Sequence, residues 1–189
     1  MTKMDSKNKT LRMTQMGMLA AISIVLILLL RIPLFPSAPF LEYDMADVPV
    51  LLAAFVLGPL PGLIVLFVVS LIQAFLLGGN GIIGLIMHFF ASGALVVVAS
   101  LIYRRCGQTT VSLIIGLVVG SLCMTALMIP FNMLFIPLLF GVGQEVVKAL
   151  IIPILIPFNL IKAGLNSVIF FLIFKSIRYL WQKKSIAEK

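Results

Sequence analysis

The sequence predicts an all-α membrane protein, and three observations support this fold class. Hydrophobic residues make up 62% of the 189 residues and charged residues only 11%, whereas soluble domains carry about 25% charged residues. The apolar residues occur in long blocks that are almost free of charge. Most basic residues lie in clusters beside these blocks. We therefore expect a single integral-membrane domain over residues 1–189, in the cell membrane, that crosses the bilayer several times.

Five blocks are long enough to cross a bilayer as α-helices. A span needs about 20 apolar residues, because each residue rises ~1.5 Å along a helix and the hydrocarbon core is ~30 Å thick. Only Arg12 and Lys162 place a charge inside these blocks. The five predicted spans are residues 11–30, 60–77, 82–103, 111–140 and 151–174.

A sixth block, residues 45–58, is shorter and by itself also fits a re-entrant segment. The basic residues favour a span, because Lys and Arg prefer the cytoplasmic side of a membrane. Of the 14 basic residues, most lie before or at the start of residues 11–30, directly after residues 82–103 or after residues 151–174. These three clusters lie on the same side of the membrane only if an even number of spans separates them. This condition requires residues 45–58 to cross the membrane as well. The sequence therefore predicts six transmembrane helices with both termini in the cytoplasm.

The sequence lacks the motifs of an ATPase or a metalloenzyme. There is no phosphate-binding G-x-x-x-x-G-K-[ST] run and no H-E-x-x-H pair. Cys106 and Cys123 suggest neither a disulfide framework nor a metal site. The basic residues lack an aromatic stacking platform, which argues against nucleic-acid binding. We therefore expect no catalytic residue, no metal and no cofactor, in a protein that binds a small molecule without an energy source of its own.

The last block carries a line of polar residues. Asn159, Lys162 and Asn166 are spaced three and four apart, so they share one face of a helix. A lysine within a span costs roughly 2.5–3.5 kcal/mol on insertion scales. The face can form the wall of a ligand site, or it can hold neighbouring helices together through hydrogen bonds. Lys162 favours the first alternative, so we take all three as candidate substrate-binding residues.

Further candidates lie on the side opposite the basic clusters. Asn132 sits between Pro130 and Pro137, and prolines within a span free backbone carbonyls for a neighbour or a ligand. Glu145 and Lys148 are three apart and can pair on one helical turn. This pair is equally compatible with a surface ion pair and with a gate or hydroxyl-binding rim. We include Asn132, Glu145 and Lys148 among the candidate substrate-binding residues.

Two loops on that side can close over a site. Residues 33–49 are rich in proline and aromatic residues and contain Asp44, which suits either a stiff lid or an ordered connector with interfacial aromatics. The turn at residues 78–81 is glycine-rich, which allows a close approach of backbone to ligand or simply a flexible turn. Asp44 and Gly79 complete the candidate set.

Small residues at a spacing of four suggest close helix packing. Gly17 and Ala21, with Ala20 beside them, lie in the first span, and Gly116 and Gly120 lie in the fifth. Such a pattern serves either packing within the bundle or docking of another membrane protein. A binding protein without an energy source needs a partner, so for the first span we favour docking through Gly17, Ala20 and Ala21.

Three motifs resemble the substrate-binding (S) components of energy-coupling factor (ECF) vitamin transporters, in particular the riboflavin-specific group. They are Asp-Met-Ala-Asp-Val-Pro at residues 44–49, Leu-Gly-Pro-Leu-Pro-Gly at 57–62 and Pro-Phe-Asn-Leu-Ile-Lys at 157–162. The resemblance covers nearly the whole chain. It implies capture of riboflavin from outside, and a complex with a transmembrane coupling (T) subunit and two cytoplasmic ATPase subunits.

The resemblance also implies where the ligand lies, namely under the first loop and between the last three helices. The candidate residues Asn132, Glu145, Lys148, Asn159, Lys162 and Asn166 fall in that region, and Gly17 and Ala21 resemble the family's alanine-rich docking face. The alternatives are an S component for another vitamin, an intramembrane enzyme that uses His88, and a channel or structural partner. The single Trp, Trp181, follows the last span, which argues against a Trp-lined thiamine site.

Overall fold

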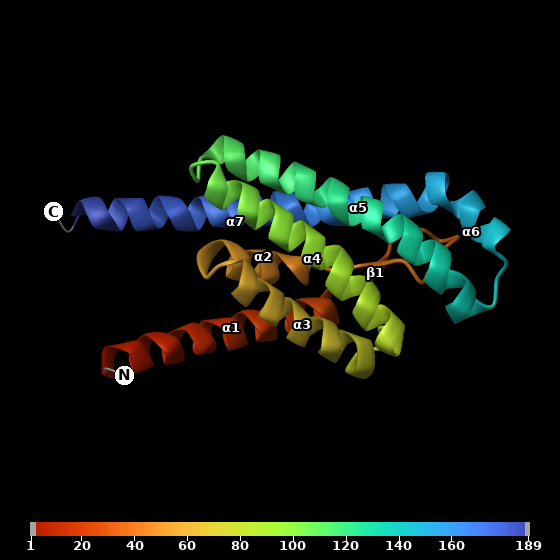
Figure 1. Cartoon of the computed structure of the whole chain (residues 1–189), viewed down its shortest axis with the longest axis horizontal. Helices are drawn as coiled ribbons and strands as arrows, with labels where there is room; N and C mark the ends of the chain where they lie inside the picture. The colour runs from red at the N-terminus through yellow and green to blue at the C-terminus, as the bar shows by residue number, and fades with distance from the viewer. Residues whose placement is uncertain (1–2, 188–189) are drawn as a thin grey trace.

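The computed structural model describes the backbone of residues 3–187 and the side chains of residues 8–179. Seven α-helices and one π-helical turn account for most of this range (Figure 1). A short antiparallel pair of strands pairs Ile32 with Tyr43. In chain order the elements are α1 (Lys3–Leu29), β1 (Ile32–Pro33), β2 (Glu42–Tyr43), α2 (Asp47–Val56), α3 (Pro59–Leu76), α4 (Gly81–Arg105), α5 (Thr110–Phe140), α6 (Gln144–Leu150), η1 (Ile151–Leu155) and α7 (Ile156–Ala187).

Five helices in the described range are long and apolar enough to cross a membrane. They coincide with the five long blocks of the sequence, and the last combines α6, η1 and α7 over residues 144–179. The five long blocks are therefore confirmed as helices of sufficient length and hydrophobicity to span a membrane. Residues 45–58 contain a helix, as predicted, but this helix, α2, has only 10 residues. Its length is therefore about 15 Å, which is half the thickness of a bilayer core.

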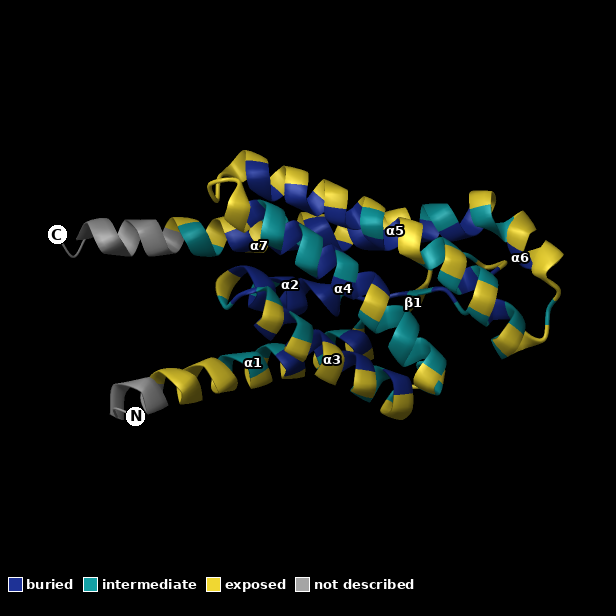
Figure 2. Ribbon diagram, in the orientation of Figure 1, coloured by how far each residue is buried: buried dark blue, intermediate teal, exposed yellow. Residues whose placement is uncertain are grey.

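The short helix α2 is enclosed by the rest of the protein. It contacts α1, α3, α4 and α7, and most of it is buried, including Asp47 at its first turn (Figure 2). An apolar helix surrounded by other helices contacts little lipid, so its length need not match the bilayer thickness. Its hydrophobicity reflects burial in the centre of the bundle.

Close packing and two arginines hold α2 in place. Gly58, at a φ of 122°, turns the chain from α2 into α3. A Cβ added at Gly62 would lie 2.5 Å from the Cβ of Ala54, so α2 and α3 meet at backbone contact. The last carbonyl groups of α2 and the turn accept hydrogen bonds from Arg12 and Arg104, which ties α1 and α4 to this helix end.

The two pairs of small residues have different surroundings. A Cβ added at Gly116 or Gly120 would lie 2.7 Å or 2.8 Å from a backbone oxygen of α4, so this pair serves packing between α4 and α5. A Cβ added at Gly17 would meet no atom of another element within 4 Å, and Gly17 and Ala21 are exposed, whereas Ala20 is buried against the bundle. The outer face of α1 is thus open at Gly17 and Ala21, and its role in docking stays a prediction.

The bundle has two distinct ends. The start of α1, the end of α7 and the α4–α5 turn lie at one end, on the left in Figure 1, which we call the terminal end. The α1–α2 connection, the α3–α4 turn and the α5–α6 turn lie toward the other, which we call the loop end (Figure 1). The three basic clusters of the sequence therefore belong to segments at the terminal end.

Candidate ligand-binding cavity

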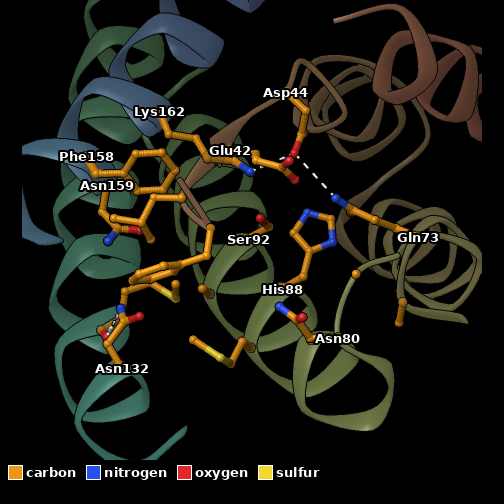
Figure 3. A pocket seen from close by; sticks show the side chains of 18 of the residues that line it. Glu42, Asp44, Gln73, Asn80, His88, Ser92, Asn132, Phe158, Asn159 and Lys162 are labelled. Carbon is orange, nitrogen blue, oxygen red and sulfur yellow. Dashed lines mark hydrogen bonds and ion pairs between the residues drawn. The ribbon is translucent and has the colours of Figure 1, made fainter. Parts of the chain in front are cut away.

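A cavity near the loop end lies between the α1–α2 connection and helices α3, α4, α5 and α7. Its volume is about 150 Å³. Pockets that bury a small-molecule ligand typically measure about 300–1,000 Å³, so a ligand of that size would also occupy space at the open mouth of the cavity. The polar lining residues are Arg31, Glu42, Asp44, Ser70, Gln73, Asn80, His88, Ser92, Asn132, Asn159 and Lys162, and Figure 3 shows most of them facing a common space.

An ion pair between Lys162 and Asp44 closes one side of the cavity. The Nζ atom of Lys162 lies 2.8 Å from Oδ2 of Asp44, and both side chains are buried. The same carboxylate accepts a hydrogen bond from Nε2 of Gln73 at 3.4 Å (Figure 3). Through Oδ1 it also accepts one from the backbone N–H of Ala46 at 3.1 Å. Asp44 therefore links the α1–α2 connection to α7 and α3 at the edge of the cavity.

The three polar residues of the last helix divide into two roles. Asn159 and Lys162 line the cavity, but Asn166 does not. Asn166 is fully buried, donates to the backbone oxygen of Asp44 at 3.2 Å and accepts from the hydroxyl of Tyr43 at 3.1 Å. Burial, assisted by the carboxylate of Asp44, raises the pKa of Tyr43, so the hydroxyl remains a donor. Asn166 thus holds the α1–α2 connection against α7.

Two buried polar atoms on the cavity wall have no hydrogen-bond partner among the described residues, namely Oδ1 of Asn159 and Oε1 of Gln73. Buried polar groups in folded proteins are almost always hydrogen-bonded, and leaving one unpaired costs about 1–3 kcal/mol. A ligand with complementary donors and acceptors would satisfy these atoms. Their concentration on one cavity is the strongest structural sign of a binding site in the described part of the chain.

Asn132 and Gly79 also line the cavity. Asn132 is buried in α5, and its Nδ2 donates to the backbone oxygen of Met128 at 2.6 Å, which leaves the amide oxygen for another partner. Gly79 lies in the α3–α4 turn at the mouth, beside Asn80. Asn80 adopts the left-handed conformation at a φ of 64°, so the turn is tight and its backbone lies against the cavity.

Glu145 and Lys148 lie outside the cavity. They pair with each other on α6 at 2.7 Å, and their side chains are 85% and 48% exposed. The structure therefore does not bring them together with the other candidates, and their contact with a ligand stays a prediction.

The structure adds residues that the sequence analysis did not select. Ser70 and Gln73 on α3, and His88 and Ser92 on α4, all line the cavity. The only signal in the sequence is polar spacing by three or four within an apolar helix, which packing interactions also produce. His88 contacts Oγ of Ser70 through Nδ1 at 2.9 Å, and its Nε2 lies 3.5 Å from Oδ1 of Asp47. Only the fold shows that this network faces the same space as Asn159.

The family model for the substrate-specific component of ECF transporters matches residues 11–174. The chain belongs to this family. The S component is similar to the riboflavin transporter RibU of Staphylococcus aureus, with 32% identity over 88% of this chain and 89% of the relative. It is also 30% identical to RibU of Streptococcus thermophilus, over 89% of this chain and 83% of the relative. With the riboflavin transporter FmnP of Bacillus subtilis it shares 27% identity over 90% and 93% of the two chains.

A solved structure of the S component of a bacterial ECF transporter has the same fold. It superposes with a TM-score of 0.79 and 31% identity, covering 92% of this chain and 98% of the other. This S component is therefore a multi-pass protein of the cell membrane and a transporter subunit, not an enzyme. The Ser70, His88 and Asp47 network consists of residue types found in hydrolase triads, and in this S component Ser70 and His88 line the cavity.

Proposed function

We propose that this S component binds riboflavin in the loop-end cavity and serves as the substrate-binding subunit for its uptake. The observation that carries the proposal is the presence of two unpaired buried amide oxygens, of Asn159 and Gln73, in a cavity that combines polar and apolar lining residues. Riboflavin has a flat apolar ring, a polar pyrimidine edge and a hydroxylated tail. The apolar part of the wall includes Met124, Met128 and Phe158, which suits the ring. The relatives named as riboflavin transporters support this substrate.

The proposed contacts are distributed over several elements. Asn159, Lys162 and Asn132 would bind the polar groups of the ligand, with Asp44 and Gly79 closing the site at the α1–α2 connection and the α3–α4 turn. Asn166 would act by positioning that connection. Glu145 and Lys148 would form part of the outer rim only after a movement of α6, because they lie outside the cavity.

The proposed orientation has the loop end outside and both termini in the cytoplasm. The basic residues at the terminal end support it, since positive residues favour the cytoplasmic side. With α2 counted as a crossing element, the chain would cross six times. The ligand cavity would then open to the extracellular side, where a transporter for uptake must capture its substrate.

The proposed partners are a transmembrane T subunit and two cytoplasmic ATPase subunits. Members of this family work as components of ECF transporters, and the described residues include no nucleotide-binding loop. We infer that the outer face of α1, at Gly17 and Ala21, contacts the T subunit, while Ala20 packs into the bundle.

The Asn159→Leu variant tests the ligand site. Leucine has a similar size but removes the unpaired amide oxygen, so we expect riboflavin affinity to fall by at least about tenfold. Quenching of riboflavin fluorescence by the detergent-purified protein measures the affinity. The control Gln15→Leu removes an amide from α1, away from the cavity, and should bind as the native chain does. If the wild-type protein is colourless after purification and does not quench riboflavin fluorescence, the assignment of riboflavin as the substrate is wrong.

The contacts of Arg31, at the start of the α1–α2 connection, are expected to slow ligand release. The guanidinium of Arg31 forms an ion pair with Glu42 and donates to the backbone oxygen of Leu77, so it ties β2 to the end of α3 at the cavity mouth. We expect Arg31→Gln to speed riboflavin dissociation roughly fivefold, because interface changes act mainly on dissociation rates. Stopped-flow fluorescence measures this rate. An unchanged rate would show that the connection does not gate the site, and Arg105→Gln serves as the control.

A further inference from the structure

A second cavity lies at the terminal end, between the end of α2, the end of α4 and α7. Its volume is about 290 Å³, and both Arg104 and Arg178 line it. It shares no lining residue with the ligand cavity. The transport function proposed above does not use it.

The guanidinium groups of Arg104 and Arg178 both have N–H donors that make no hydrogen bond within the described residues. Nη2 of Arg104 donates to the backbone oxygens of Phe55 at 3.0 Å and Ala54 at 3.3 Å. Nη1 of Arg178 donates to the hydroxyl of Tyr103 at 3.1 Å and to the backbone oxygen of Gln108 at 2.8 Å. A guanidinium has five N–H donors, and one nitrogen of each group makes all of these bonds. The contacts therefore hold both side chains at the cavity while leaving N–H groups for an anion.

No carboxylate neutralises this pair of cations among the side chains of residues 8–179. The acidic side chains in that range pair with other residues, namely Glu42 with Arg31, Asp44 with Lys162, Asp47 with His88 and Glu145 with Lys148. Arg105 and Lys175 add further positive charge nearby on α4 and α7. An anion at the cavity would relieve this repulsion, and arginine forks match phosphate oxygens well.

Apart from Tyr103 and Gln108, the rest of the cavity wall is apolar. Phe55 and Phe174 are buried, whereas Val56 is 39% exposed and connects the cavity to the outer surface. A free phosphate ion would gain nothing from this wall, but the glycerol and acyl part of a lipid would. In the proposed orientation the terminal end faces the cytoplasmic leaflet, which carries anionic lipids. We propose that this cavity binds the phosphate headgroup of an anionic phospholipid, with Arg104 and Arg178 as its ligands.

Native mass spectrometry of the detergent-purified chain, titrated with phosphatidylglycerol or phosphatidylcholine, tests this proposal. We expect phosphatidylglycerol to be retained preferentially, and Arg178→Gln to lower its affinity about tenfold, because charge-assisted hydrogen bonds are lost. The matched control is Arg105→Gln, which removes the arginine next to Arg104 at the end of α4, outside the cavity. It should retain the lipid as the native chain does.

Three outcomes would overturn the proposal. The first is equal retention of the two lipids, and the second is equal loss of phosphatidylglycerol in Arg105→Gln, which indicates general surface attraction. The third is displacement of the lipid by millimolar inorganic phosphate, which assigns the site to a soluble anion. Riboflavin quenching measured on the same samples shows whether each variant is folded. It also separates failure of the lipid site from failure of the proposed substrate, since the two cavities have no residue in common.

Discussion

Replacing Lys162 by methionine is expected to abolish riboflavin binding and to destabilise the protein at the same time. The ammonium group lies 2.8 Å from the buried carboxylate of Asp44. Removing one partner of a buried ion pair leaves an uncompensated charge and costs about 3–5 kcal/mol. The variant also loses a donor on the cavity wall, so affinity should fall by about 100-fold or more. Thermal unfolding in detergent and riboflavin quenching measure the two effects.

The double variant Asp44→Asn with Lys162→Met separates these effects. It removes both charges, so the midpoint of thermal unfolding should return toward that of the native chain. Riboflavin affinity should stay low, because neither charged group is available to the ligand. If affinity recovers together with stability, Lys162 serves only to hold the α1–α2 connection, and its proposed contact with riboflavin is wrong.

The second large effect is expected at Gly62, where α2 and α3 meet. A Cβ at this position would lie 2.5 Å from the Cβ of Ala54 and 2.8 Å from its Cα. Because backbone atoms cannot move aside as a flexible side chain can, we expect Gly62→Val to cost about 3 kcal/mol or more. A lower midpoint of thermal unfolding and a smaller yield of monodisperse protein would show this effect.

Two matched variants test the cause of the Gly62 effect. Gly164 lies in α7 with no atom within 4 Å of an added Cβ, so Gly164→Ala should be neutral or stabilising, by up to about 1 kcal/mol from helix propensity. Combining Gly62→Ala with Ala54→Gly removes the nearest clashing atom and should restore part of the stability lost in Gly62→Ala alone. Equal destabilisation by Gly164→Ala would contradict the packing explanation.

The sequence alone predicted the helices well because their signal is local. Apolar blocks of sufficient length identify spans without knowledge of their neighbours, and the five long blocks are helices in the structure. The α2 segment was harder to interpret, since 10 residues cannot match a bilayer core. Its burial by four other helices depends on contacts that no local pattern contains.

The candidate site was predicted only in part. Asn132, Asn159 and Lys162 stood out because polar residues are rare in spans, and all three line the cavity. The contributions of Gln73, His88 and Ser92 were not predicted, because an isolated polar residue in an apolar helix looks the same in a site and in a packing contact. Asn166 was predicted to line the site because it shares a helix face with Lys162. In the structure it instead forms a hydrogen bond with the α1–α2 connection.

Composition, hydropathy and helical spacing thus determined that this chain is a helical membrane protein with a polar line in its last span. Only the tertiary structure decided that Asp44 meets Lys162, 118 positions away. It also decided that Gly116 packs inside the bundle while Gly17 remains exposed, although both belong to the same spacing pattern. The physical reason is that a pattern along one helix defines a face, whereas the partner of that face depends on how distant segments pack.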